Sequence, residues 1–271
     1  NGVAIVARQY WQAQQALKSL KVAFDDGPNA SLSDASLNAQ YRAALGGAAW
    51  KIVKTEGEAV SGEGMKDKFA SVYSQEYESQ FLAHATMEPM NCTAHVTDEE
   101  CKVWGPIQGN QLAQVALASA LKLPPEKVAI NRTLLGGGFG RRLLADFILQ
   151  AALVSRAIGK PVKVVWSREE DMQHDVYRPA TLQRVTVGLD RAGKPAAIAH
   201  NVVSPSILQY VFPPAVTEDN DPSCLEGLME THYQIPSQRV DFHLLKIGAP
   251  TSVLRTTGYG PNIFAVESLI D

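Results

Sequence analysis

Hydrophobic residues along the chain recur at two spacings, which predicts a mixture of strands and helices. From Phe69 onward, short apolar or alternating segments predict strands at 70–78, 94–97, 101–104, 127–133, 161–166, 181–189, 195–203 and 239–245. A helical spacing predicts helices at 108–122, 142–158 and 260–271. In the helix 142–158, Leu144 and Ile148 share one face, and Gly159 ends it. The pattern therefore predicts a mixed α/β fold of the α+β class.

The first 28 residues predict a small strand–helix–strand unit. Segment 3–7 is apolar, 8–20 has a helical stripe, and 22–24 is apolar again. A cluster of turn-forming residues at 25–29 ends this unit. A unit of this size buries little surface by itself, so we expect it to be part of a larger domain.

Small and polar residues dominate the next segment, 29–68. A short helix is expected within 34–49, and 54–68 is typical of a linker or an extended arm. Further along, four prolines and acidic turns predict a long ordered loop at 204–226.

Composition excludes several classes of protein. The 271 residues are 45% hydrophobic and 20% charged, which is ordinary for a globular protein. A net charge of −3 without a dense basic run argues against nucleic-acid binding. No apolar stretch reaches the ~18–20 residues that a membrane span needs. Three cysteines, Cys92, Cys101 and Cys224, are too few for a disulfide framework or an iron–sulfur cluster.

Residues 135–142 form a glycine cluster, Leu-Gly-Gly-Gly-Phe-Gly-Arg-Arg, between a predicted strand and a predicted helix. Glycine permits positive φ angles and lets backbone N–H groups approach a ligand. The cluster predicts either a backbone cradle for a polar or anionic group or a tight strand-to-helix turn. Arg141 stands where a dinucleotide fingerprint needs its third glycine, and the Gly-Lys-Ser/Thr of a phosphate-binding loop is absent.

Several further motifs occur in a fixed order with this cluster. They are His84–Ala94, Val103–Gln108, Trp166–Met172, His174-Asp175, Tyr177–Pro179, Leu254–Asn262 and Phe264–Ser268. Together they resemble the molybdopterin-binding large subunit of the xanthine dehydrogenase and aldehyde oxidase family. The likeness is strongest to the branch of isoquinoline 1-oxidoreductase subunit beta.

The resemblance implies a division of the chain into three parts. Residues 1–28 would be the C-terminal part of an α/β hammerhead domain, 29–68 a linker or arm, and 69–271 the first molybdopterin cofactor-binding domain. The chain starts inside an apparent strand and ends inside a predicted helix. We therefore expect it to be a fragment of a longer subunit whose second cofactor-binding domain follows.

The resemblance also implies which residues face the cofactor. Gln108 would bond an oxo ligand of the molybdenum, and Phe139 would form a wall beside it. The glycines 137, 138 and 140 would offer backbone donors. The remaining expected contacts are Arg141, Arg255, Thr256, Thr257 and Gly258. Gln108, Phe139 and Arg255 would take part in catalysis, while no side chain would ligate the metal.

Each of these residues also has a plainer interpretation. Gln108 is equally suited to the N-terminus of a helix, Phe139 to core packing, and Arg255 to a surface ion pair. Arg141 and Arg142 sit unfavourably at a helix start, which indicates a carboxylate or a cofactor phosphate as partner.

Three polar residues near the site are expected to be structural. Glu88 would pair with an arginine or accept backbone hydrogen bonds, because a buried carboxylate needs partners. His84 and Asn91 are likewise expected to be structural residues. A zinc site is disfavoured, because the histidines and cysteines at 84–101 lack zinc-binding spacings.

Departures from the family pattern bear on the substrate. Purine-oxidising members have a glutamate where this chain has Leu143, and an arginine where residues 224–229 offer none. The essential glutamate of the family lies in a later Gly-x-Gly-Glu motif that does not occur here. An aromatic N-heterocycle or an aldehyde is thus expected rather than xanthine, and the fragment alone should be inactive.

By resemblance, the cofactor is molybdopterin, in the cytosine dinucleotide form, and water supplies the oxygen of the hydroxylation. Electrons would pass to [2Fe–2S] clusters on a small partner subunit and, in this branch, to a cytochrome c. The branch is often exported folded to the periplasm, with the cytoplasm as the alternative. A competing hypothesis is a non-catalytic cofactor-binding or assembly module with the same fold.

Overall fold

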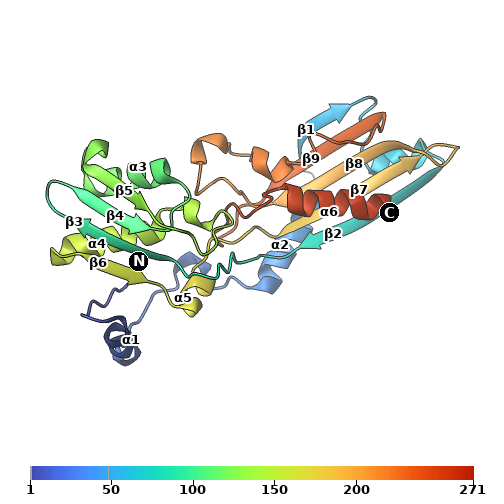
Figure 1. Cartoon of the computed structure of the whole chain (residues 1–271). Coiled ribbons are helices and arrows are strands. Elements are labelled where there is room, and N and C mark those ends of the chain that lie inside the picture. Colours follow the sequence, from blue (N-terminus) through green and yellow to red (C-terminus); the bar gives the residue numbers. More distant parts are fainter. Residues whose placement is uncertain (1, 48) are drawn as a thin grey trace.

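Two β-sheets organise the molecule, which a computed structural model describes for residues 2–47 and 49–271 (Figure 1). The strands are β1 (Lys51–Glu56), β2 (Ser71–Ser79), β3 (Asn91–Val96), β4 (Cys101–Gly105), β5 (Val128–Arg132), β6 (Val162–Val165), β7 (Thr181–Leu189), β8 (Pro195–Ser204) and β9 (Ser237–Leu244). The α-helices are α1 (Tyr10–Ser19), α2 (Asp34–Gly46), α3 (Asn110–Leu121), α4 (Asp146–Ile158), α5 (Arg168–Gln173) and α6 (Tyr259–Ile270). Short 3₁₀ helices lie at Gly27–Asn29, Glu63–Asp67, Pro125–Lys127, Arg141–Leu143, Pro213–Ala215 and Pro222–Leu225.

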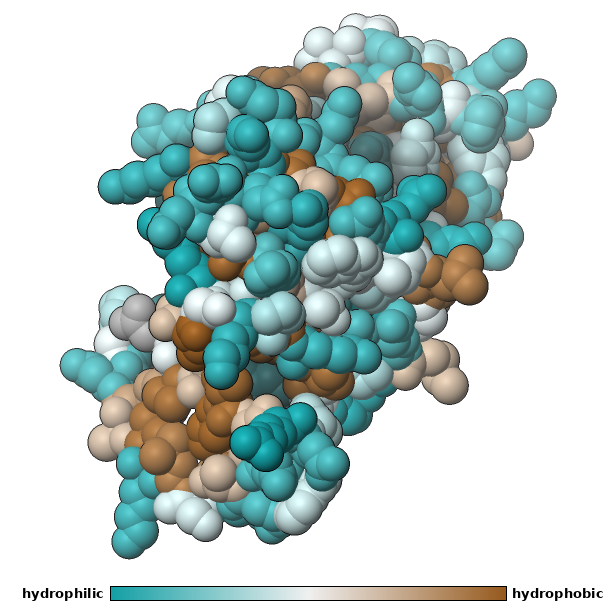
Figure 2. Space-filling view, turned by 60° about the vertical axis from the view of Figure 1, so that its left-hand side comes forward, coloured by the Kyte–Doolittle hydropathy of each residue, from teal (hydrophilic) through white to brown (hydrophobic). Residues whose placement is uncertain are grey.

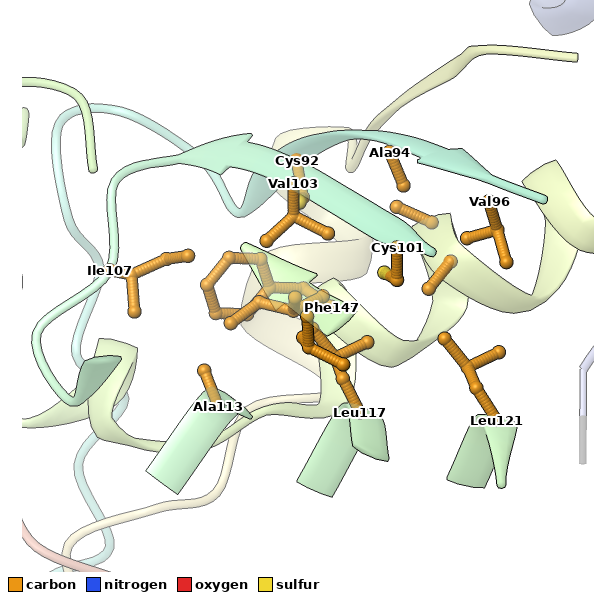
Figure 3. Close-up of a cluster of buried hydrophobic side chains, with 14 of the residues drawn as sticks. Cys92, Ala94, Val96, Cys101, Val103, Ile107, Ala113, Leu117, Leu121 and Phe147 are labelled. Carbon is orange, nitrogen blue, oxygen red and sulfur yellow. The ribbon is translucent and has the colours of Figure 1, made fainter. Parts of the chain in front are cut away.

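The smaller sheet has the strand order β5-β4-β3-β6 and is covered by α3 and α4. Burial alternates along β3, because every second side chain of a strand points to the same face. Figure 3 shows these inward side chains meeting those of the two helices, with Phe147 among them. Phe147 is fully buried. A single apolar core thus holds this unit together.

Strand direction brings four connecting segments to one edge of this sheet. β4 and β5 are parallel, while β3 is antiparallel to both β4 and β6. The segments after β4, β5 and β6 and the segment before β3 therefore all leave from the same edge. In open α/β sheets, the carboxyl ends of parallel strands are where ligand sites are commonly built.

The larger sheet has the order β1-β9-β8-β7-β2 and is covered on both faces. α2 packs Tyr41 against Leu182 of β7, whereas α6 packs Ala265 against Val185. Positions 182 and 185 of a strand point to opposite faces, so the two helices lie on opposite sides of the sheet. Bridges between the segments at 82 and 178, and at 177 and 251, join the two units.

Most of the predicted elements are confirmed, including the mixed α/β class. Every strand and helix predicted from residue 70 onward is present, with boundaries shifted by a few residues. A helix also occupies 10–19 and another 34–46, and segment 204–226 is a loop with two short 3₁₀ turns. Among the described residues, no helix is both long and apolar enough to span a bilayer.

Four local expectations were wrong or incomplete. The strands expected at 3–7 and 22–24 are not formed, because neither segment pairs with another strand in the described chain. Residues 51–56, partly assigned to an arm, form β1 and pair with β9. The short helix α5 was not predicted at all. The division of the chain at residues 28 and 68 stays a prediction.

The N-terminal segment is the least packed part of the described chain. None of the residues of α1 is buried, and apolar side chains on the helix and its flanks are exposed. In Figure 2, brown side chains gather on the lowest lobe, which this segment forms in Figure 1. Trp11 is 58% exposed and Phe24 is 65% exposed. Its apolar surface is therefore open to solvent.

The core of the smaller unit provides a stability test. Replacing the fully buried Phe147 by Ala should lower the free energy of unfolding by about 3–5 kcal/mol, because burial is lost and a cavity forms. Leu153→Ala on the same helix is the matched control, since Leu153 is 49% exposed. Denaturant titration of both variants checks this, and equal losses would contradict the assigned core.

Candidate functional site

Gln108 and the glycine loop meet at the sheet edge described above. Gln108 follows β4, and the loop, residues 136–140, follows β5. The Oε1 atom of Gln108 accepts hydrogen bonds from the backbone N–H of Gly140 (3.2 Å) and Arg142 (3.1 Å). Its Nε2 has no partner in the described chain, and the residue is exposed. The amide thus fixes the loop with its oxygen and leaves two N–H donors for a ligand.

Three successive backbone donors of the loop are also unused. The N–H groups of Gly137, Gly138 and Phe139 donate to no atom of the described residues. Positive φ angles at Gly137 (96°), Phe139 (55°) and Gly140 (106°) curve this stretch. Successive N–H groups in such a curved segment form a concave site for anions. The geometry therefore supports the cradle interpretation over a simple turn.

The loop is closed tightly enough that side chains are excluded. A Cβ at Gly138 would lie 2.6 Å from Oε1 of Gln108, and one at Gly140 would lie 2.5 Å from the carbonyl oxygen of Val253. Both distances are shorter than the contacts that Cβ atoms make in proteins. Glycine is needed at position 140, where the clash would be with backbone and φ is 106°, whereas a side chain at position 138 would displace the amide of Gln108.

The Arg255 segment, residues 253–258, lies directly against the glycine loop. The backbone N–H of Arg255 donates to the carbonyl of Phe139 (2.8 Å). Thr256 (φ 78°) and Thr257 (φ 41°) adopt the left-handed region, which is costly for residues other than glycine. The exposed guanidinium of Arg255 has no partner among the described residues, so a surface ion pair is not observed. The structure thus brings together three of the predicted groups: Gln108, the loop and Arg255.

A carboxylate that was not singled out supports this segment. Glu226 accepts hydrogen bonds from the hydroxyl of Thr257 and from the N–H of Gly258 (3.4 Å). Partial burial raises the pKa of Glu226. Sequence reasoning noted only the missing arginine at 224–229. Glu226 and Thr257 are 31 residues apart, so no local sequence pattern indicates this contact.

Beneath the loop, Arg142 is a structural anchor. Its side chain is 0% exposed, and its Nε donates to the carbonyl of Gly137 (2.7 Å). Its Nη2 donates to the carbonyl of Glu88 (2.6 Å) and lies 3.3 Å from the carboxylate of Glu88. Glu88 also accepts the N–H of Gly136 (2.8 Å). The expectation that Glu88 pairs with an arginine and accepts backbone hydrogen bonds is confirmed.

Arg141 is buried as deeply, and carboxylates surround it. Asp146 binds its two terminal nitrogens (2.9 and 2.6 Å), and Asp175 lies 2.8 Å from its Nε. Its guanidinium also lies over the ring of Trp166, 5.5 Å from the centroid. Burial works against the charge, but the pairing with Asp146 and Asp175 raises the pKa of Arg141.

This geometry corrects the cofactor contact expected of Arg141. A guanidinium that is 1% exposed cannot reach a ligand outside the loop, and the backbone N–H of Arg141 donates to Gly138 (2.9 Å). Of the two kinds of partner expected for these arginines, the structure shows carboxylates for both. Positioning of the loop is the role that the contacts of Arg141 support.

The three cysteines are core residues of the described structure. Each is free and buried. Burial raises the pKa of Cys92 to about 12 and that of Cys101 to about 11. Thiols with such a pKa are neutral and unreactive at physiological pH. Among the described residues, no group of histidine, cysteine and carboxylate side chains could hold a metal ion.

Comparison with known families agrees with this geometry. Residues 49–271 match the model of the molybdopterin cofactor-binding domain. The chain belongs to this family. The match includes Gln108, the glycine loop and the Arg255 segment, and it begins just before β1.

Individual relatives are named as oxidoreductase subunits, and one of them is named as a molybdenum-binding subunit. Isoquinoline 1-oxidoreductase subunit beta of Brevundimonas diminuta is 31% identical over 286 residues, covering 100% of this chain and 36% of that protein. The aldehyde oxidoreductase molybdenum-binding subunit of Escherichia coli (strain K12) is 32% identical, over 72% of this chain and 26% of that protein. The chain therefore spans only about a third of the length of such relatives.

A solved structure shares the fold. Quinoline 2-oxidoreductase from Pseudomonas putida 86 superposes with a TM-score of 0.72 at 18% identity, over 98% of this chain and 34% of that one. The predicted membership in the xanthine dehydrogenase and aldehyde oxidase group is confirmed by the family match and these relatives.

The anchoring role of Arg142 predicts a large effect of its removal. Arg142→Met should lower the free energy of unfolding by about 3–5 kcal/mol, because Glu88 and two backbone carbonyls would lose their buried partner. Arg184→Met is the control, since the side chain of Arg184 is 37% exposed and its pair with Glu76 is worth about 1 kcal/mol or less. Denaturant titration measures both, and similar values would argue against the anchor.

Proposed function

We propose that this chain is the part of a molybdenum hydroxylase catalytic subunit that holds the molybdopterin cofactor. The observation that supports this most directly is the set of unused donors at one site. Three backbone N–H groups at 137–139, the amide nitrogen of Gln108 and the guanidinium of Arg255 are all available to an acceptor. A set of donors without a nearby free carboxylate suits the oxygen-rich, anionic groups of a molybdenum–pterin centre.

Within this proposal, each residue has a defined task. The amide nitrogen of Gln108 and the N–H groups of Gly138 and Phe139 would donate to oxygen atoms of the cofactor. Arg255 would supply a fixed positive charge beside them. The cofactor itself provides the redox chemistry when it is bound. The protein contributes donors that are already oriented, because the inward-facing contacts of Arg142 hold the loop.

The side chains around the loop support an apolar substrate. Met87 is 90% exposed, Leu134 is 94% exposed and Phe139 is 45% exposed. Leu143, which stands where purine-oxidising members have a glutamate, is partly buried in an apolar cluster with Val253. Such a surface offers little to the polar rim of a purine. We propose an aromatic N-heterocycle or an aldehyde as the substrate, oxidised with water as the oxygen source.

The complete enzyme would include parts outside this chain. We propose a second cofactor-binding domain with the catalytic glutamate, and a small partner subunit with [2Fe–2S] clusters that accepts the electrons. The cytosine dinucleotide form of the pterin, a cytochrome c as a later acceptor and a periplasmic location belong to the same proposal. Isoquinoline 1-oxidoreductase and nicotinate dehydrogenase relatives are named as subunits, which supports a complex.

Metal and nucleotide analysis of the intact native protein tests the proposal. We expect about one molybdenum per protomer, CMP after acid hydrolysis and iron from a co-purifying subunit. Absence of molybdenum and of an iron-containing partner would favour the competing hypothesis of a non-catalytic module with the same fold.

Gly138 provides a second test of cofactor binding. Gly138→Val should reduce the molybdenum content to near zero, because a side chain would collide with the amide of Gln108 and distort the donors. Gly46→Val is the control, since a Cβ there meets no atom of the described chain within 4 Å. Elemental analysis of the two purified proteins measures their molybdenum content. Full molybdenum occupancy in Gly138→Val would refute the cradle.

Gln108 tests the donor role separately from binding. In the complete enzyme, Gln108→Ala should reduce turnover per bound molybdenum by roughly ten- to a thousandfold, which is typical for loss of one oriented donor. Steady-state rates with aldehydes and N-heterocycles, normalised to metal content, give the measurement. Unchanged turnover would remove Gln108 from the reacting site.

A further inference from the structure

A buried histidine connects the segment before Arg255 with the segment after α5. His84 lies in the segment before β3, and its side chain is 1% exposed. Its Nε2 lies 2.8 Å from the carbonyl oxygen of Val253. Its Nδ1 lies 3.0 and 3.1 Å from the two carboxylate oxygens of Asp175. The ring therefore bridges the segment before Arg255 and the segment after α5.

Both of these neighbours are hydrogen-bond acceptors. A backbone carbonyl has no proton to donate, so Nε2 must donate to Val253. An ionised carboxylate cannot donate either, so Nδ1 must donate to Asp175. A neutral imidazole has only one N–H group and would leave one of these contacts without a proton. With Asp175 ionised, the two contacts together require an imidazolium.

The surroundings of Asp175 show that it is ionised. Besides His84, its carboxylate accepts the backbone N–H of His84 (2.6 Å) and of Val176 (2.7 Å) and lies beside Arg141. Burial opposes the charge of Asp175, and these two backbone N–H donors together with the guanidinium of Arg141 compensate for it. The alternative, a protonated Asp175 that donates to Nδ1 of a neutral His84, would remove the negative charge that faces Arg141.

The balance of charge beneath the loop agrees with a protonated His84. Arg142 pairs with Glu88 and Arg168 with Asp171, whereas Arg141 has two carboxylate partners, Asp146 and Asp175. Around Arg141, two negative charges therefore face one guanidinium. A buried charge without a partner is costly, so a positive charge on His84 completes the group.

We propose that His84 is a positioning residue that clamps the Arg255 segment to the glycine loop as an imidazolium. The clamp acts through Val253, because its carbonyl receives the Nε2 proton and also lies against Gly140. Two residues later, the N–H of Arg255 bonds to Phe139. On its other side, His84 holds Asp175, which lies 2.8 Å from Nε of Arg141, the residue that follows the glycine loop. His84 thus links the two loops without touching a ligand. Its relevance to catalysis rests on the proposed function, whereas the clamp itself does not.

Observation of the ring protons tests the charge directly. In the intact protein, ¹⁵N-histidine NMR at pH 7.5 should show both nitrogens of His84 protonated, with the signal assigned through its loss in His84→Gln. His200 is the matched internal control, because it is also buried and its pKa is lowered to about 4. A neutral tautomer at His84 would overturn the proposal.

Hydrogen exchange tests the clamp. A glutamine has donors only on one atom, so His84→Gln cannot serve Asp175 and Val253 together. Amides at 253–258 should exchange at least tenfold faster in this variant. Ser155→Ala is the control, since Ser155 is buried but binds Val96 and Lys160, away from the loops. Unchanged exchange at 253–258, or an equal increase in the control, would overturn the clamp.

Neither measurement requires bound molybdenum. A protein without cofactor can therefore still show the protonated ring and the protected segment, in which case only the proposed function fails. Conversely, a molybdenum-loaded protein with a neutral His84 would retain the proposed function and lose the clamp.

Discussion

Burial of two adjacent arginines in the 3₁₀ turn before α4 constrains the whole site region. The side chains of Arg141 and Arg142 are 1% and 0% exposed, and a charge removed from water to this degree needs close partners. Those partners come from before β3, from α4 and from after β6. Three of the four segments that leave one edge of the smaller sheet, those after β5 and β6 and the one before β3, are thereby fastened to one another. The glycine loop can therefore remain concave without internal apolar support.

Local pattern was sufficient for most of the elements and for the loop itself. The Gly-rich run predicted either a backbone cradle or a tight turn, because tolerance of positive φ is a property of the residue type. The strands at 3–7 and 22–24 failed for the opposite reason, since an apolar segment becomes a strand only when another strand pairs with it. The assignment of Arg141 to a ligand failed because its partners lie up to 34 residues away, where no local pattern indicates them.

The contacts divide the loop into an inner and an outer side. On the inner side, the carbonyl oxygen of Gly137 accepts from Arg142, and the N–H of Gly140 donates to Gln108. On the outer side, the N–H groups of residues 137–139 point to no atom of the described chain. Such a division suits a ligand whose electron-rich atoms are recognised by main-chain donors. It also agrees with a fold shared with quinoline 2-oxidoreductase at only 18% identity, because main-chain donors depend on backbone shape more than on side-chain identity.

Gln108 contributes to both the inner and the outer side of the loop. Its oxygen closes the loop through Gly140 and Arg142, and its nitrogen is left for whatever occupies the site. Rotation of a single amide would therefore break the closure and withdraw the donor at the same moment. Occupancy and loop order become thermodynamically linked variables, and the linkage is reciprocal. A ligand that engages this nitrogen stiffens the loop, and any change that loosens the loop weakens the ligand by the same free energy.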